Sequence, residues 1–180
     1  MSGQSLRTLA RLLEVPERTL RRAAAEGMVH GRRVSERRYE TTLREEMYLR
    51  EHWPLLRTLR AALRTEPNVR LAVLFGSVAT GHESEHSDLD LLVVLGDQTA
   101  GAVAALAQRL SDRTDRDVQL VRLQEAERSP ALMADALAQG RVLVDRDVAW
   151  PGLRAAERRW RRKAAAATPL LESAPDLELS

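Results

Sequence analysis

Two aspartates, Asp88 and Asp90, stand where an apolar run from Leu89 to Leu95 begins, and they carry the clearest chemical signal in the chain. Because side chains alternate faces along a strand, residues two apart point the same way, and both carboxylates can reach one point. Two like charges aimed together repel each other unless a cation lies between them. Hard oxygen ligands of this kind suit Mg²⁺, which binds through one or two carboxylates together with substrate phosphates. The pair predicts a magnesium site at the mouth of a strand, with a solvated strand end as the alternative.

A glycine–serine turn, Gly76 and Ser77, precedes the aspartates and directly follows a first apolar run, Leu71 to Phe75. Glycine lets the backbone come close to a ligand, and serine offers its hydroxyl and its N–H where a helix or turn begins. These groups suit the phosphates of a nucleotide. We therefore predict that Gly76 and Ser77 bind phosphate, and an ordinary turn is the alternative.

Gly76-Ser77, ten further residues and then Asp88-Leu89-Asp90 resemble the GS-x10-DxD signature of the polymerase-β superfamily of nucleotidyltransferases, in particular its minimal (MNT) group. The resemblance covers roughly residues 66–148. It implies an α/β (α+β) fold with a small mixed sheet flanked by helices. It also implies that Ser77 holds the terminal phosphates of ATP or another NTP, while Asp88 and Asp90 hold Mg²⁺. An acceptor hydroxyl then attacks the α-phosphate and pyrophosphate leaves.

Two positions depart from the family pattern. The third carboxylate of the family, on the strand expected over Asp117 to Leu123, falls on Gln119. Asp117 lies on the same strand face, about 6.6 Å back at ~3.3 Å per residue. Either Asp117 is the third catalytic and metal-binding carboxylate, or that carboxylate is missing. Thr80 also stands where many relatives have an arginine. These departures keep a non-enzymatic regulator with a nucleotide-sensing domain open as the alternative function.

The first 40 residues contain two short helical patterns, from Ser5 to Glu14 and from Pro16 to Gly27, separated by a tight break. They resemble the helix-turn-helix of bacterial transcription regulators. Phosphate binding needs a cluster of cations, and arginines on a recognition helix can reach guanine edges. We predict an all-α domain that binds duplex DNA, although two amphipathic helices can also be plain packing. The predicted DNA-binding residues are Arg18, Arg21, Arg22, Arg32 and Arg33.

The chain divides into four predicted segments. Residues 1–40 form the helix-turn-helix domain, 41–65 a connecting helix, 66–148 the nucleotidyltransferase domain, and 149–180 a C-terminal helix and acidic tail. We expect the connecting helix to be amphipathic and to cover the sheet. A rigid connector or the seam of a homodimer are the alternatives that remain open.

Composition and charge narrow the class of protein. Hydrophobic residues make up 44% of the 180, enough for a core, and residues 1–64 carry 14 arginines against 8 glutamates. Without cysteine there is no thiol chemistry, and we expect His82 and His86 to be solvated rather than zinc ligands. No apolar run has the length of a membrane span, so we expect a cytoplasmic protein without membrane contact.

The resemblance to the MNT group also indicates the partner. Members of this group often act as antitoxins that modify a HEPN-type toxin, and this chain lacks a large helical domain to hold an antibiotic. We therefore expect transfer of AMP from ATP to a hydroxyl of a macromolecular acceptor, such as a toxin partner.

Overall fold

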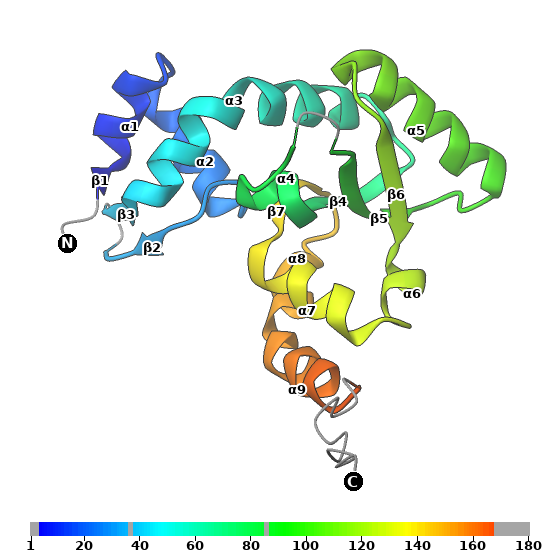
Figure 1. The fold of residues 1–180 in the computed structure, drawn as a ribbon. Coiled ribbons are helices and arrows are strands. Elements are labelled where there is room, and N and C mark those ends of the chain that lie inside the picture. Colours follow the sequence, from blue (N-terminus) through cyan, green and yellow to red (C-terminus); the bar gives the residue numbers. More distant parts are fainter. Residues whose placement is uncertain (1–3, 36–37, 85–86, 168–180) are drawn as a thin grey trace, which may run out of the picture.

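The structure is a computed structural model that describes residues 4–35, 38–84 and 87–167 (Figure 1). A small N-terminal part of short helices and strands lies beside a larger part in which helices flank a sheet. His86 and the predicted acidic tail, which begins at residue 168, lie outside the described residues.

The N-terminal part contains the two predicted helices, α1 (Leu6–Leu12) and α2 (Glu17–Ala25). The Ser5 hydroxyl caps α1 by accepting a hydrogen bond from the Thr8 N–H at 3.3 Å. Beside the helices lies an antiparallel sheet that the sequence did not predict, with strand order β1-β3-β2. Its strands are β1 (Gln4–Ser5), β2 (Arg32–Arg33) and β3 (Tyr39–Thr41).

The predicted connecting helix is α3 (Leu43–Arg64), an unbroken helix of 22 residues. The Thr42 hydroxyl caps it, and Pro54 lies inside it without ending it. Leu49, Leu56 and Leu59 are completely buried, and the helix packs on α5, β4 and β7. The amphipathic helix that covers the sheet is therefore confirmed, while the homodimer seam stays a prediction.

The larger sheet has four strands in the order β6-β5-β4-β7. Strand β4 pairs antiparallel with both β5 and β7, whereas β5 pairs parallel with β6. The predicted small mixed sheet is thereby confirmed. The strands are β4 (Val69–Phe75), β5 (Leu89–Leu95), β6 (Val118–Arg122) and β7 (Arg141–Asp145).

Alternation along β5 assigns its residues to opposite faces of the sheet. Leu89, Leu91 and Val93 belong to a hydrophobic cluster with α3 and α5, and this cluster continues into α1 and α2 of the N-terminal part. Leu92 belongs to a second cluster, on the face covered by α7. Asp90 has the parity of Leu92 and therefore lies on the α7 face. In Figure 1, α3 and α5 lie above the sheet and α7 lies below it.

The remaining helices follow the sheet strands. One C-terminal helix was predicted within residues 149–180, but the chain forms two there, which meet at Ala156. The helices are α4 (Gly76–Thr80), α5 (Ala100–Thr114), α6 (Leu123–Ala126), α7 (Pro130–Gln139), α8 (Trp150–Ala155) and α9 (Glu157–Ala167). Among the described residues, no helix combines the length and the apolar character that crossing a bilayer requires.

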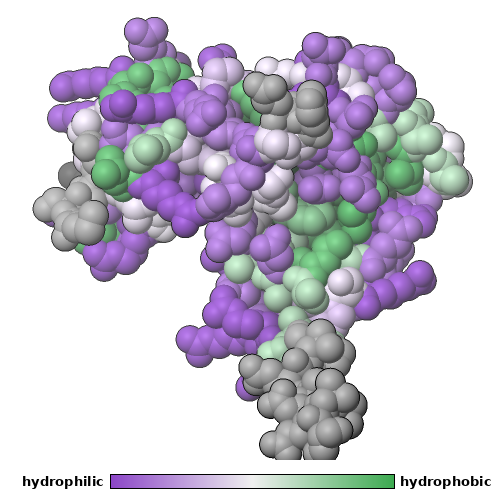
Figure 2. Space-filling view, viewed as in Figure 1, coloured by the Kyte–Doolittle hydropathy of each residue, from purple (hydrophilic) through white to green (hydrophobic). Residues whose placement is uncertain are grey.

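Some apolar side chains on the α7 face of the sheet remain accessible to solvent. Val121, Leu123 and Leu132 pack against the second cluster but remain partly exposed. Figure 2 shows apolar side chains at the surface in this region, between α7 and β6, while hydrophilic side chains dominate much of the remaining view.

Candidate active site

The turn after β4 brings Gly76 against the carboxylate of Asp90. Gly76 has a φ of +75°, and a Cβ added there would lie 2.7 Å from Oδ2 of Asp90. Positive φ is costly for a residue with a side chain. Both the backbone conformation and the close approach therefore require glycine. Phe75, immediately before it, pairs with Asp90 in the sheet, which fixes the two segments side by side.

Asp88 and Asp90 stand together where β5 begins. Asp88 is exposed, and Asp90 is partly buried. Burial raises the pKa of Asp90 above its ordinary value, and the negative charge of Asp88 raises it further. This mutual repulsion is the situation that a divalent cation relieves. The donor set of two carboxylates at the end of a strand thus fits Mg²⁺, which takes its other oxygens from phosphates and water.

The two candidates for a third carboxylate position lie at the start of β6, with Asp117 immediately before the strand and Gln119 within it. In the parallel register Asp90 pairs with Gln119 and Leu89 pairs with Val118. The Leu89 N–H also donates to the Asp117 carbonyl at 2.8 Å, so Asp117 lies alongside Asp88 at the exposed edge. Within the described residues, no group of three or more histidine, aspartate or glutamate side chains is arranged to hold a metal ion. The role of Asp117 stays a prediction.

The turn around Ser77 is organised by Thr80. Its hydroxyl donates to the carbonyls of Gly76 at 3.3 Å and Ser77 at 3.0 Å, so this residue closes the short helix α4. Ser77 is partly buried at the start of α4. His82 is exposed, and its ring contacts the Thr80 hydroxyl and the Arg44 guanidinium. The predicted phosphate-binding turn is thus held by the Thr80 side chain, and its role stays a prediction.

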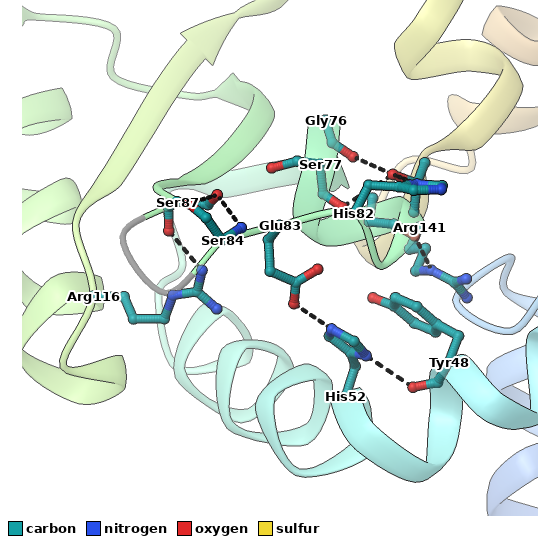
Figure 3. Close-up of polar contacts among 12 residues, drawn as sticks. Tyr48, His52, Gly76, Ser77, His82, Glu83, Ser84, Ser87, Arg116 and Arg141 are labelled. Carbon is teal, nitrogen blue, oxygen red and sulfur yellow. Dashed lines mark hydrogen bonds and ion pairs between the residues drawn. The ribbon is translucent and has the colours of Figure 1, made fainter.

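Hydrogen bonds from Arg116, Ser84 and Ser87 support the loop that leads into Asp88 (Figure 3). The Arg116 guanidinium donates to the Ser87 carbonyl at 2.6 Å, and the Ser84 N–H donates to the Ser87 hydroxyl at 2.9 Å. Sequence reasoning missed this support, because serines and an arginine in polar segments give no signal of mutual contact.

A buried ion pair joins this region to the N-terminal part. Arg141 on β7 donates to both carboxylate oxygens of Glu45 on α3, at 2.7 and 2.9 Å, and both residues are at most 5% exposed. The same guanidinium donates to the carbonyl of Ala79 in α4 at 2.8 Å and to that of Met28 at 3.2 Å. One side chain therefore holds β7, α3, α4 and the segment after α2 together.

Aromatic rings extend this network towards the loop. The Arg141 guanidinium lies 3.6 Å from the ring centre of Tyr48, and Tyr48 stacks on His52 with ring centres 4.2 Å apart. The His52 Nδ1 donates to the Tyr48 carbonyl at 2.9 Å, and Nε2 contacts the carboxylate of Glu83 (Figure 3). Glu83 belongs to the loop between the turn and the aspartates. The network was not predicted, because its members are far apart in the sequence.

The predicted DNA-binding arginines are exposed on two elements. Arg18, Arg21 and Arg22 lie on α2, and Arg32 and Arg33 form β2. Some of them make ion pairs on the surface: Arg21 with Glu17 at 2.6 Å, Arg22 with Glu26 at 2.7 Å, and Arg32 with Glu40 at 3.6 Å. The structure brings these residues to one part of the molecule, and their role stays a prediction.

The fold and this site together define a nucleotidyltransferase. The family described as polymerase beta, nucleotidyltransferase, matches residues 57–149, just over half of the chain. The chain belongs to this family. A comparison with curated proteins gives no match.

Solved structures of toxin–antitoxin complexes resemble the chain. A crystal structure of a toxin–antitoxin with AMP-PNP has 28% identity and a TM-score of 0.51, and the match covers 62% of this chain and 90% of that chain. The toxin–antitoxin MntA–HepT has 26% identity and a TM-score of 0.48, with 63% and 90% covered. A tri-AMPylated Shewanella oneidensis HEPN toxin in complex with MNT antitoxin has 26% identity and a TM-score of 0.44, with 67% and 91% covered.

Proposed function

We propose that this chain transfers AMP from ATP, in the presence of Mg²⁺, to a hydroxyl group of a protein partner. The observation that carries the proposal is the contact between the Asp90 carboxylate and the positive-φ glycine of the turn, with Asp88 beside it. A phosphate-binding turn next to two repelling carboxylates is the arrangement that phosphoryl chemistry with a divalent cation needs.

Each residue then has a defined task. Asp88 and Asp90 hold the magnesium ion, which neutralises charge on the phosphates when it is bound. Ser77 and the turn bind the terminal phosphates, and Asp117 accepts the proton of the attacking hydroxyl. The acceptor oxygen forms a bond to the α-phosphorus while the bond from that phosphorus to the pyrophosphate oxygen breaks. The products are the AMP-modified acceptor and pyrophosphate.

The acceptor that we propose is a toxin of the HEPN type, as the MNT resemblance implies. The structure of a toxin–antitoxin with AMP-PNP supports a protein partner and an adenine nucleotide, since that complex contains both. The apolar surface between α7 and β6 lies on the same sheet face as Asp90, and provides room for a partner beside the carboxylates.

The test uses ATP labelled at the α-phosphate, Mg²⁺ and a purified toxin of the HEPN type. We expect label on the toxin and release of pyrophosphate with the parent protein. The double variant Asp88→Asn with Asp90→Asn should do neither and should lose Mg²⁺-dependent ATP binding in calorimetry. The matched control is Asp112→Asn with Asp135→Asn, which removes two exposed aspartates from α5 and α7. Unchanged ATP affinity in the first variant would overturn the site assignment.

A second candidate function is a DNA-binding regulator that senses nucleotide without turning it over. The exposed arginines on α2 and β2 favour it, because a surface of this charge suits the phosphates of a duplex. The same labelling experiment separates the two functions. A sensor would bind ATP but release no pyrophosphate with any acceptor.

A further inference from the structure

A groove between α2 and α3 is lined by arginines from both helices. Its volume is about 790 Å³, and none of the residues that line it is acidic. Arg18 and Arg22 come from α2, whereas Arg57, Arg60 and Arg64 come from α3. Five arginines therefore line one hollow of a protein whose formal net charge is only +2.

Helix geometry explains why the five arginines converge. Residues three, four and seven positions apart share one face of a helix. Arg57, Arg60 and Arg64 have this spacing on α3, and Arg18 and Arg22 have it on α2. The two arginine faces therefore meet across the groove. We call this site the arginine groove.

The charge of the arginine groove is only partly neutralised from within the protein. Glu26 accepts from Arg22 at 2.7 Å, lies 3.7 Å from Arg64, and also pairs with Arg60, so one carboxylate serves three guanidinium groups. Arg18 and Arg57 form no ion pair within the described part of the chain.

Arg60 is the buried cation of the arginine groove. It is 9% exposed, and burial lowers the pKa of its guanidinium. The charge of Glu26 opposes this shift, whereas the charges of Arg64 and Arg22 lower the pKa further. A buried cation beside two other cations is stabilised when anionic oxygens enter the site. An anion with several phosphates meets that need best.

A second basic hollow lies on the other side of α2. It is lined by Arg21, Arg33 and Arg38, from α2 and the β2–β3 hairpin. A helix with its side chains is about 10–12 Å across and fits the major groove of B-DNA, which is about 12 Å wide. With α2 in the major groove, the two basic hollows would face the two phosphate strands that border it.

We propose that the arginine groove binds one phosphate strand of duplex DNA, so that α3, which packs on the larger sheet, contributes directly to DNA binding through Arg57 and Arg64. This inference rests on the second candidate function and extends it beyond the residues of α2 and β2. Arg60, which is buried in the groove, positions Glu26 and adds to the positive electrostatic potential of the groove.

The experiment measures binding of a fluorescent 30-base-pair duplex by anisotropy between 50 and 200 mM salt. The variant Arg57→Gln with Arg64→Gln removes two exposed cations of the groove. The matched control, Arg158→Gln with Arg162→Gln, removes two exposed arginines of α9. Each phosphate contact contributes about 0.9 to the slope of log K against log salt, so the groove variant should lose about 1.8 from that slope. Across this fourfold salt range the parent should therefore lose about 12-fold more affinity than the groove variant.

The outcomes separate this inference from the function on which it rests. If the groove variant keeps the affinity and slope of the parent while Arg18→Gln with Arg22→Gln loses both, DNA binding stands but the contribution of α3 is overturned. If the parent binds single-stranded RNA but no duplex, the duplex assignment is overturned. Thermal unfolding of each variant checks that the fold is retained.

Discussion

Two charged regions of this molecule differ in whether their charges are paired. The Arg141–Glu45 pair is buried, but each nitrogen of the Arg141 guanidinium has an acceptor, and the pair links four segments. Asp88 and Asp90 place like charges together where the inner strand β5 begins, and burial, followed by the charge of Asp88, raises the pKa of Asp90. Matched charges inside the protein serve the fold, whereas we propose that the unmatched charges at the start of β5 serve a ligand. The following changes test this contrast.

Removing the buried cation should have the largest effect. Arg141→Met leaves the Glu45 carboxylate buried without its partner, and we expect the free energy of unfolding to fall by about 3–5 kcal/mol. Urea denaturation measures this loss. In the double variant Arg141→Met with Glu45→Met much of the stability should return, because no buried charge is then left alone. Arg109→Met, which breaks an exposed pair with Glu66, should have a far smaller effect. Equal losses in Arg141→Met and Arg109→Met would contradict the comparison.

Changes to the carboxylates at the start of β5 and β6 should alter enzymatic activity rather than stability. Asp117→Asn should lower turnover about 10²-fold or more, which corresponds to about 2.7 kcal/mol in activation free energy. ATP affinity should change little, because Asp117 acts on the acceptor hydroxyl. Gln119→Asp should leave activity equal or higher, since it places a carboxylate beside Asp90. Pyrophosphate release that is indifferent to Asp117→Asn would show that this residue is not the base.

A change in the Gly76 turn should affect both stability and ATP binding. Gly76→Ala forces a side chain into the left-handed region and against Asp90, so we expect a loss of about 1–2 kcal/mol from the backbone alone, together with weaker ATP binding. Gly101→Ala is the control, since its Cβ would have nothing within 4 Å in helix α5. That change should raise stability by up to about 1 kcal/mol. Calorimetry of both variants measures the change in stability and the change in ATP affinity. If Gly76→Ala changed neither, the inferred close approach of Gly76 to Asp90 would be wrong.

The smallest expected effect is in the dependence of stability on pH. The pKa of Asp90 is raised in the folded state, so the folded protein holds this proton more tightly than the unfolded chain does. The contribution of Asp90 to stability is therefore present at low pH and lost as the pH rises through its folded pKa. Asp88→Asn removes one cause of the shift and should flatten the decline. The difference in melting temperature between each protein and its Asp90→Asn derivative, followed from about pH 4 to 7, isolates this contribution. An identical difference in both backgrounds would show that Asp88 does not act on Asp90.

The sequence predicts the larger part of this molecule well, for an identifiable reason. Strands β4 and β5 have seven residues each, all but one of them apolar, and they are bounded by Gly76 and by Asp88. Runs of this kind are typical of buried strands. The strands β1, β2 and β3 have two or three residues each, too few to show any periodicity, and they were missed for that reason.

Some of the polar features are also visible in the sequence, whereas others are not. The spacing of Arg57, Arg60 and Arg64 on one helical face is visible in the sequence and could have indicated the arginine groove. The pairing of Arg141 with Glu45 could not have been predicted, because the residues are 96 positions apart and each resembles an ordinary surface charge. Only the packing of β7 under α3 makes them partners.

The hydrophobic cluster that includes Leu6, Leu20, Leu56 and Leu91 crosses from the N-terminal part into the sheet without a break. Opening the first two helices would expose leucines of α3 that also support β5, so local unfolding of either part costs the packing of the other. The chain should therefore unfold as a single cooperative unit. For the same reason, neither part should survive intact if a protease cuts the chain within α3.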